Sequence, residues 1–368
     1  MKFTCEKSIL QAAVNTASRA VPSKSSISAL EGLLITSGEK LRITGYDLKK
    51  AIYTDIDADI VTGGSMVINA RFFGEMIRRM PDGIITISSD ENNNITAKCG
   101  KSEYNFIGLD QGDYPEMPRF SEINYIEIPQ NILRSMITQT IFAVAKEEIR
   151  PIYTGTLFDI EDGNLTLVSV DGYRLAKRSE TVNTEKMENC SFVVPGFALS
   201  DIEKICEDSD ETVKISVGEK HISFTINDTV VITRRLEGEF LNYKKSIPEA
   251  FKYEFKVEKS EIISVIDRVA LMLSEKSGSP IRMSFNDGII NCLCVTPIGK
   301  AEDVCVCSGD GEGLEIGFND KYLLDAFKNA DADELQICLN TSSSPCILKA
   351  ADDSGKFTYM ILPVRLNG

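Results

Sequence analysis

The sequence predicts an α+β protein made of three tandem copies of one unit of about 120 to 130 residues. Its 368 residues exceed what one hydrophobic core usually organises. A strand-like segment followed by an amphipathic helical segment occurs three times, and a second helical segment with a fixed charge pattern also recurs. We therefore expect domains at residues 1–122, 123–249 and 250–368, with short, stiff connections near 118–125 and 246–252.

Each unit is expected to open with a strand that leads into its first helix. Alternating apolar and polar residues predict the three strands in 2–5, 125–128 and 254–257. Apolar residues four positions apart predict the helices in 9–14, 132–137 and 261–266. The three segments align without gaps, and the alignment places a helix N-cap at Ser8, Asn131 and Ser260.

A β-hairpin is predicted between the two helices of each unit. The hairpins cover 33–44, 156–168 and 281–295, and Asp-Gly dipeptides mark two of the three turns. Each unit then ends in a strand-rich segment close to a proline, in 104–115, 230–248 and 357–363.

The second helix of each unit is predicted in 72–80, 198–206 and 322–330. An acidic residue at the fourth position and a basic residue at the seventh recur at spacings of 126 and then 124 residues. This spacing predicts i,i+3 ion pairs on an exposed helix face. The predicted pairs are Glu75 with Arg78, Asp201 with Lys204, and Asp325 with Lys328.

The charge distribution limits how the chain could meet nucleic acid. A net charge of −15 argues against a protein that coats DNA with its whole surface. Segments 7–24, 71–79, 129–150, 196–206, 259–276 and 319–328, which contain the predicted helices, carry a net charge of +5, and the rest of the chain carries −20. A weakly basic helical side would allow loose contact with phosphates, although ordinary solvated helices would show the same pattern.

Few residues predict chemistry. His221, the single histidine, lies in an alternating run and is expected on the polar face of a strand, so a Ser-His-Asp or Cys-His nucleophile system is disfavoured. There is no phosphate-binding glycine loop. Two Cys-x-Cys pairs in predicted strands would form a zinc site if their thiols faced one another, whereas packing of small apolar side chains also explains them. These cysteines are Cys292, Cys294, Cys305 and Cys307.

The sequence also gives an expectation for the compartment. No apolar leader follows Met1, and no later segment reaches the length of a membrane span. Ten cysteines without a dense disulfide spacing indicate reduced thiols. We expect a cytoplasmic protein.

Besides the threefold repeat, four segments resemble those of a known protein family. They are 1–4, 170–176, 240–243 and 359–366. Through them the chain resembles the bacterial DNA polymerase III β subunit, the replicative sliding clamp, along its whole length. The resemblance implies three DNA-clamp domains in a head-to-tail homodimeric ring around duplex DNA, with helices lining the hole and antiparallel sheets outside. It implies a processivity factor that tethers polymerases without chemistry of its own, so no catalytic residue, metal or cofactor is expected. The DNA-directed DNA polymerase activity belongs to the holoenzyme.

The resemblance also implies partners and site residues. The partners would be double-stranded DNA, the replicative polymerase α subunit, the clamp loader and other proteins with a clamp-binding motif, and no membrane. Short peptides from these proteins would bind a cleft lined by Tyr153, Gly172, Tyr173, Arg174, Leu175, Leu241, Lys245, Ser344, Pro345, Met360, Ile361, Leu362, Pro363, Val364, Arg365 and Leu366. The DNA-facing residues would be Lys24, Arg71, Arg79, Lys146 and Arg150. At the dimer interface, Tyr104 and Phe106 would meet Leu271 and Met272 of the other subunit.

Tyr173 stands where the family often has His, and Leu241 stands where it often has Pro. These two differences would affect which peptides the cleft prefers. Two other readings of the sequence belong to different classes. The acidic body and the weakly charged helices of the third domain would also suit a peptide-binding scaffold that does not encircle DNA. A zinc-dependent enzyme would use the four cysteines named above.

Overall fold

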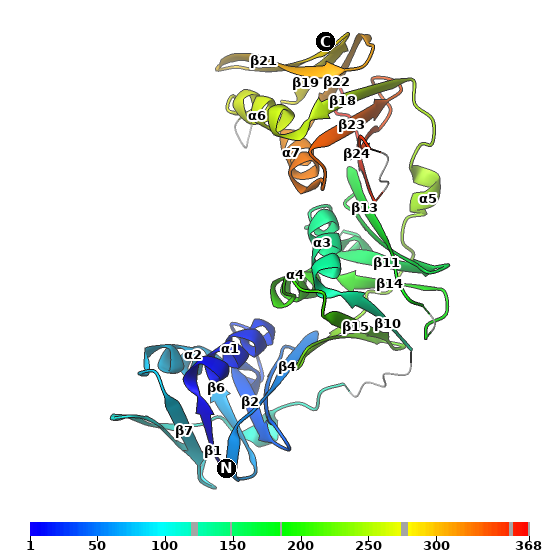
Figure 1. Ribbon diagram of the computed structural model, residues 1–368. Helices are drawn as coiled ribbons and strands as arrows, with labels where there is room; N and C mark the ends of the chain where they lie inside the picture. Colours follow the sequence, from blue (N-terminus) through cyan, green and yellow to red (C-terminus); the bar gives the residue numbers. More distant parts are fainter. Residues whose placement is uncertain (119–123, 148, 185, 274–278, 353–355, 367–368) are drawn as a thin grey trace. The chain divides into compact units, whose positions relative to one another are not determined.

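The computed structural model describes residues 1–118, 124–147, 149–184, 186–273, 279–352 and 356–366 (Figure 1). The chain divides into two compact units, and the boundary between them passes through the middle third of the sequence. Unit 1 comprises residues 1–134, 183–188 and 197–235, and unit 2 comprises 135–182, 189–196 and 236–368. Two helices cross this boundary, α3 (Gln130–Ile141) and α4 (Gly196–Ile205).

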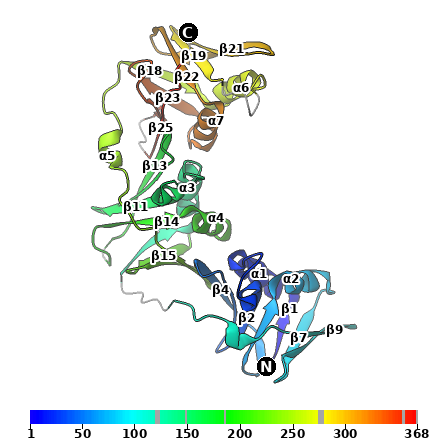
Figure 2. The ribbon, with the colours of Figure 1, turned by 180° about the vertical axis from the view of Figure 1, so that it is seen from behind.

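Unit 1 contains two antiparallel sheets and the helices that cover them (Figure 2). The five-stranded sheet has the order β5 (Asp59–Thr62), β1 (Lys2–Glu6), β7 (Ile84–Ser89), β8 (Asn94–Cys99), β9 (Ser102–Ile107). Helices α1 (Lys7–Ala17) and α2 (Ala70–Arg79) pack against each other. Their buried faces join a core that includes Leu10, Phe73 and Ile77. β9 lies at the edge of this sheet, which leaves one side of the strand open.

The second sheet of unit 1 continues from the first third of the chain into the middle third. Its order is β10 (Tyr125–Pro129), β15 (Thr212–Val217), β16 (His221–Ile226), β17 (Thr229–Arg234), β4 (Lys50–Ile56), β3 (Leu41–Tyr46), β2 (Gly32–Ser37), β6 (Ser65–Asn69). The continuation is made by β17 and β4, which pair from Thr229 opposite Thr54 to Thr233 opposite Lys50. Backbone hydrogen bonds therefore join the two domains.

Unit 2 contains a twelve-stranded sheet with the same kind of continuation. Its order is β14 (Cys190–Pro195), β11 (Gly155–Glu161), β12 (Asn164–Val170), β13 (Arg174–Thr181), β25 (Phe357–Ile361), β24 (Cys346–Ala350), β23 (Glu334–Leu339), β18 (Tyr253–Glu258), β21 (Gly299–Ser308), β20 (Ile289–Thr296), β19 (Ile281–Asn286), β22 (Glu312–Phe318). Here β13 of the middle domain pairs with β25, the last strand of the chain, from Arg174 opposite Ile361 to Arg178 opposite Phe357.

The helices of unit 2 repeat the arrangement of unit 1. α6 (Lys259–Ala270) and α7 (Asp320–Asn329) pack together. Both contribute to a large core with Phe255, Phe285 and Tyr359. A short helix, α5 (Tyr243–Ser246), precedes β18. Among the described residues, no helix is long and apolar enough to cross a membrane.

The predicted strands and helices are present within a few residues, but the predicted N-caps are wrong. The first helices begin at Lys7, Gln130 and Lys259, so Ser8, Asn131 and Ser260 lie inside them. Glu258, the last residue of β18, caps α6 by accepting hydrogen bonds from the backbone N–H groups of Ser260 (3.0 Å) and Glu261 (2.7 Å). Each strand leads directly into its helix, so the extended residue at the strand end takes the capping position.

Two of the three predicted i,i+3 ion pairs are also wrong. Glu75 does bind Arg78, at 2.6 Å. Asp201 instead binds Lys50 of β4, and Asp325 binds Arg174 of β13 at 2.6 Å. Both carboxylates are drawn away from their own helix because a cation from the preceding domain reaches them.

Of the predicted connections, residues 119–123 of the first lie outside the described part of the chain.

Candidate partner-binding site

Lys50 and Arg174 occupy equivalent places at the two domain junctions. Each is the first residue of its strand and the last of the four residues between two paired positions, since Tyr46 pairs with Ala51 and Val170 pairs with Leu175. Each is buried, and each donates to an aspartate on the second helix of the following domain. The same construction therefore holds both junctions.

All three guanidinium nitrogens of Arg174 donate a hydrogen bond within the protein. Nε donates to Asp171 Oδ2 at 2.9 Å, Nη1 to Asp325 Oδ2 at 2.6 Å, and Nη2 to the carbonyl oxygen of Phe142 at 2.6 Å. The ring of Tyr322 lies against the guanidinium group, 4.5 Å from Cζ. Because each nitrogen already donates to an acceptor of the protein, Arg174 orders the surrounding loop, and a bound carboxylate would have to compete with these acceptors.

An apolar cluster lies beside this junction and contains four of the predicted cleft residues. Leu175 and Met360 are buried within it, and Tyr153 and Leu241 are partly buried against it. Tyr153 also meets Phe240 edge to face, with ring centroids 5.5 Å apart. The partly exposed side chains over a buried apolar base give a surface that an apolar peptide side chain can cover.

The end of the chain borders the same region. Ile361 is the last residue of β25, and the Leu362 N–H then donates to the Tyr173 carbonyl oxygen at 2.9 Å. The Val364 N–H donates to the Gly317 carbonyl oxygen at 2.8 Å, which fixes the segment beyond the strand. Pro363 and Leu366 are half-buried, whereas Val364 and Arg365 are exposed. This segment therefore lies outside the core strand, with the Val364 and Arg365 side chains exposed.

Tyr173 and Gly172 form the exposed tip of the loop before β13. Gly172 has a φ of +93°, a backbone conformation that glycine adopts most readily. Tyr173 is 62% exposed, and its ring stacks on that of Tyr322, with centroids 6.1 Å apart. Tyr322 was not among the sequence-predicted site residues. Its place one turn before Asp325 on the second helix could have indicated it.

The remaining predicted cleft residues lie on the short helix α5 and in the loop before β24. Lys245 is exposed on α5, where its backbone N–H donates to Asn242 Oδ1 at 3.3 Å. Ser344 and Pro345 are half-buried in the loop that leads into β24, and the Ser344 hydroxyl lies 2.6 Å from that of Thr341. The structure thus gathers Tyr153, Leu175, Leu241 and Met360 into one cluster and places Gly172, Tyr173, Arg174 and Leu362 along the β13–β25 junction.

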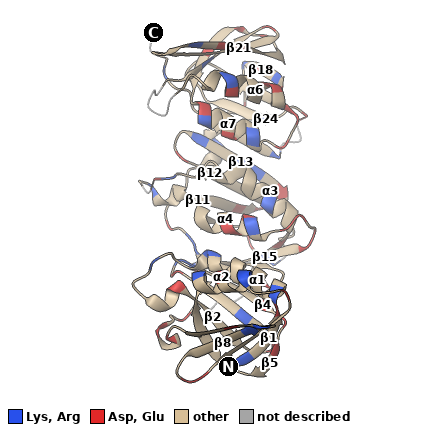
Figure 3. Cartoon of the chain, turned by 90° about the vertical axis from the view of Figure 1, so that its left-hand side faces the viewer, with Lys and Arg blue, Asp and Glu red and all other residues tan. Residues whose placement is uncertain are grey.

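The predicted DNA-facing residues are all exposed. Lys24 and Arg71 have exposed side chains, and Arg79 keeps an ion pair with Glu75 at 3.1 Å. Lys146 and Arg150 follow α3, and the Arg150 guanidinium lies 5.7 Å from the ring centre of Tyr153. Basic residues lie on α1 and α2 in Figure 3, although α2 also carries Glu75, and α7 carries residues of both signs. The positive charge of the helical segments therefore belongs mainly to the first domain.

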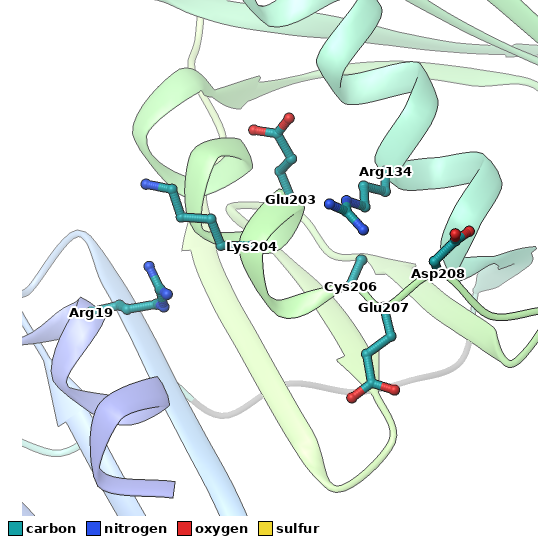
Figure 4. Close-up of a pocket in the computed structure, with 7 residues that line it drawn as sticks. All are labelled: Arg19, Arg134, Glu203, Lys204, Cys206, Glu207 and Asp208. Atoms are coloured by element: carbon teal, nitrogen blue, oxygen red, sulfur yellow. The ribbon is translucent and has the colours of Figure 1, made fainter. Parts of the chain in front are cut away.

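An open depression of about 710 Å³ in unit 1 lies between the end of α4 and its neighbours (Figure 4). Three acidic and three basic side chains line it, so it has no strong preference for an anion or a cation. Burial raises the pKa of the Cys206 thiol to about 12, which keeps the thiol protonated and unreactive at neutral pH. The lining residues are Arg19, Arg134, Glu203, Lys204, Cys206, Glu207 and Asp208.

The predicted dimer residues lie beside two open strand edges. Tyr104 and Phe106 belong to β9, and Phe106 meets Phe72 with ring centroids 4.9 Å apart. Leu271, 81% exposed, and Met272 follow α6. Near them, β18 pairs with β21 only at Cys307 and Ser308 in the described chain.

The rest of the β21 edge is partly closed by side chains. The Val304 N–H donates to Asp303 Oδ1 at 2.8 Å, and the Val306 N–H donates to Glu261 Oε1 at 3.0 Å. Residues 299–303 are therefore the part of β21 that keeps an open edge.

The four cysteines of the zinc hypothesis lie in one buried core, but no two of them are directly opposite across the ladder. Cys292 pairs with Asp303, and Cys305 pairs with Ile290, across the β20–β21 ladder. Burial raises the pKa of the Cys292 and Cys305 thiols to about 12, as expected for small side chains packed in the core. The register that the zinc hypothesis required is therefore wrong. His221, on β16, is half-buried, and burial together with Arg234 and Lys220 lowers its pKa.

The fold and the site together define a protein of three equivalent α+β domains whose surfaces are suited to binding. Models of the N-terminal, central and C-terminal domains of the DNA polymerase III beta subunit match residues 1–118, 127–242 and 244–365. The chain belongs to the DNA polymerase III beta subunit family.

Solved and curated relatives agree along the full length. The beta sliding clamps of Bacillus subtilis and Halalkalibacterium halodurans are each 32% identical to it, over 99% of this chain and 100% of theirs. The crystal structure of the Bacillus subtilis DNA polymerase sliding clamp superposes with a TM-score of 0.96 at 31% identity, covering 100% of both chains.

Proposed function

We propose that two copies of this chain close head to tail into a ring that encircles duplex DNA and acts as a sliding clamp. Within the chain, the last strand of one domain pairs with the strand after the four-residue loop of the preceding domain, as β17 does with β4 and β25 with β13. β9 is the last strand of the first domain, and β21 follows the equivalent loop of the third. A second copy supplies the missing partner for both strands, which closes every exposed edge of this kind.

The basic helical segments support a loose hold on DNA. Lys24, Arg71, Arg79, Lys146 and Arg150 are exposed cations in an otherwise acidic chain, and long cationic side chains contact phosphates without reading base sequence. Weak, sequence-independent attraction suits sliding, and the closed ring supplies the retention. Such a clamp performs no chemistry and works in the cytoplasm, with the replicated DNA.

The cluster next to Arg174 supports a peptide-binding role. Short apolar segments of the polymerase α subunit, the clamp loader and other partners would cover Tyr153, Leu175, Leu241 and Met360. The exposed Tyr173 and Arg365 would border the bound peptide and contact its polar groups. This site tethers the partners to the ring.

Retention on DNA of different topology tests the ring. The protein is loaded on a nicked circular duplex with its clamp loader, and the amount retained is measured before and after the circle is cut by a restriction enzyme. We expect stable retention on the circle and rapid loss from the linear duplex, because a ring held by topology leaves over a free end. Equal retention on both forms would contradict the proposal.

A further inference from the structure

The three junctions of the proposed ring can be compared position by position, because four residues separate one paired position from the next in each hairpin, although the β20–β21 ladder continues one pair further, with Gly299 opposite Thr296. Val295 pairs with Lys300 as Tyr46 pairs with Ala51 and Val170 with Leu175. The residue in the place of Lys50 and Arg174 is therefore Gly299. Its φ of +152° is favourable for glycine, and an added Cβ would lie 3.0 Å from Met272 Cε. The junction between subunits thus lacks the buried cation.

The acidic residue on the second helix also has different partners at the junction between subunits. Glu75 holds the place of Asp201 and Asp325 on the second helix. It binds Arg78 at 2.6 Å and Arg79 at 3.1 Å, both on its own helix. Its charge is thus satisfied within the subunit, and the ion pair common to the two internal junctions has no counterpart at the third.

The same comparison gives the strand register between subunits. In the hairpins that precede the last strands, Cys99 pairs with Ser102 as Ile226 pairs with Thr229. Glu103 is therefore equivalent to Val230, which lies opposite Tyr53 in the internal junction. On β21, the residue equivalent to Tyr53 is Glu302.

Side-chain directions support this register. It places Ile107 opposite the partner's Ile298, and the two are 77% and 78% exposed in the single chain. It also places half-buried Tyr104 opposite the partner's Ala301, which is likewise half-buried, so inward-facing residues meet inward-facing ones.

We infer that Glu103 lies directly opposite the partner's Glu302, so that each junction between subunits carries a like-charge pair where the internal junctions carry none. The inference rests on the proposed head-to-tail ring. Glu103 and Glu302 are exposed, and each has a lysine on its own subunit, Lys98 at 3.1 Å and Lys300 at 2.7 Å. Facing carboxylates destabilise an antiparallel pair, and with the missing ion pair they make this junction the weakest of the three.

Charge reversal tests the inference. Glu302→Lys places a cation opposite Glu103, and Glu103→Lys does the same from the other strand. Because a ring contains two such junctions, we expect each variant to lower the dimer dissociation constant by about fivefold in sedimentation equilibrium. The double variant restores a like-charge pair and should lose most of this gain.

Glu127→Lys is the matched control. Glu127 is an exposed glutamate on strand β10, so its reversal changes net charge equally without touching the proposed junction. A dimer that Glu302→Lys and Glu103→Lys strengthen no more than Glu127→Lys does would overturn the inference but leave the ring intact. A wild-type chain that stays monomeric at high micromolar concentration would instead overturn the proposed ring.

Discussion

Arg174 shows how one side chain links the core, the domain junction and the candidate binding surface. It is 7% exposed, and its three acceptors come from its own loop, from Phe142 just after α3 and from α7. Arg365, in contrast, is exposed at the end of the chain. Both arginines were predicted to border the same cleft, but in the structure Arg174 is buried and hydrogen-bonded, whereas Arg365 is exposed.

We predict that substitution of Arg174 mainly lowers stability, whereas substitution of Arg365 mainly weakens peptide binding. Arg174→Met leaves Asp171 and Asp325 without their cation and should remove about 3 kcal/mol of stabilisation, because breaking a buried ion pair costs far more than an exposed one. Arg365→Ala should change stability by no more than about 0.5 kcal/mol but weaken binding of a labelled clamp-binding peptide. Thermal unfolding and fluorescence anisotropy measure the two effects. Equal destabilisation by both variants would refute the distinction.

At this scale the sequence alone was a limited guide. An acid and a base recur on the second helix, but two of the three ion pairs predicted from this pattern do not form, because Asp201 and Asp325 bind cations far away in the sequence. Helix periodicity reports only neighbours on one helix, so it does not reveal these contacts. The matching 124-residue spacing from Lys50 to Arg174 and from Asp201 to Asp325 was the signal that could have found them.

Among the elements, the first helices of the domains differ in how their N-termini are capped. α6 begins with a carboxylate cap from Glu258, whereas Glu6 at the start of α1 makes no capping hydrogen bond to the backbone. Alternation and helical periodicity predicted these strands and helices well, because both report the buried face. They did not locate the caps, since a strand that runs directly into a helix has no separate capping residue.

Glu258 should therefore stabilise the protein in a pH-dependent way. Hydrogen bonds from the Ser260 hydroxyl and from the backbone N–H groups of Ser260 and Glu261 hold the pKa of Glu258 below its usual range. Because the folded-state pKa is the lower one, this contribution is complete above the unfolded pKa and is lost as pH falls through the folded value.

The melting temperature of the wild type minus that of Glu258→Gln should thus be positive at pH 7 and shrink toward acidic pH. Glu6→Gln serves as the control and should give a smaller difference at pH 7. A difference for Glu258→Gln that stays constant with pH would contradict this account.

For the whole molecule, exposed apolar residues on β9 and near β21 are the features that a second subunit explains. Ile107→Asp should leave the single chain folded, because its side chain is 77% exposed, yet raise the dimer dissociation constant at least about tenfold by placing a charge in an apolar contact. Analytical ultracentrifugation and circular dichroism measure the two effects. Val61→Asp is the control, since Val61 is an exposed residue of β5 at the other edge of the same sheet. A dimer of unchanged strength in Ile107→Asp would place the interface elsewhere.

The threefold repeat has a kinetic consequence in the proposed ring. At the β4–β17 and β13–β25 junctions the two strands belong to one chain, so after a local separation they meet again at an effective concentration of the order of millimolar, however dilute the protein is. The β9–β21 junctions have no such tether, and after both have opened their re-formation depends on the free subunit concentration. Dilution therefore weakens the ring only at the two β9–β21 junctions. A ring that is already closed around DNA persists for as long as both of these junctions stay paired.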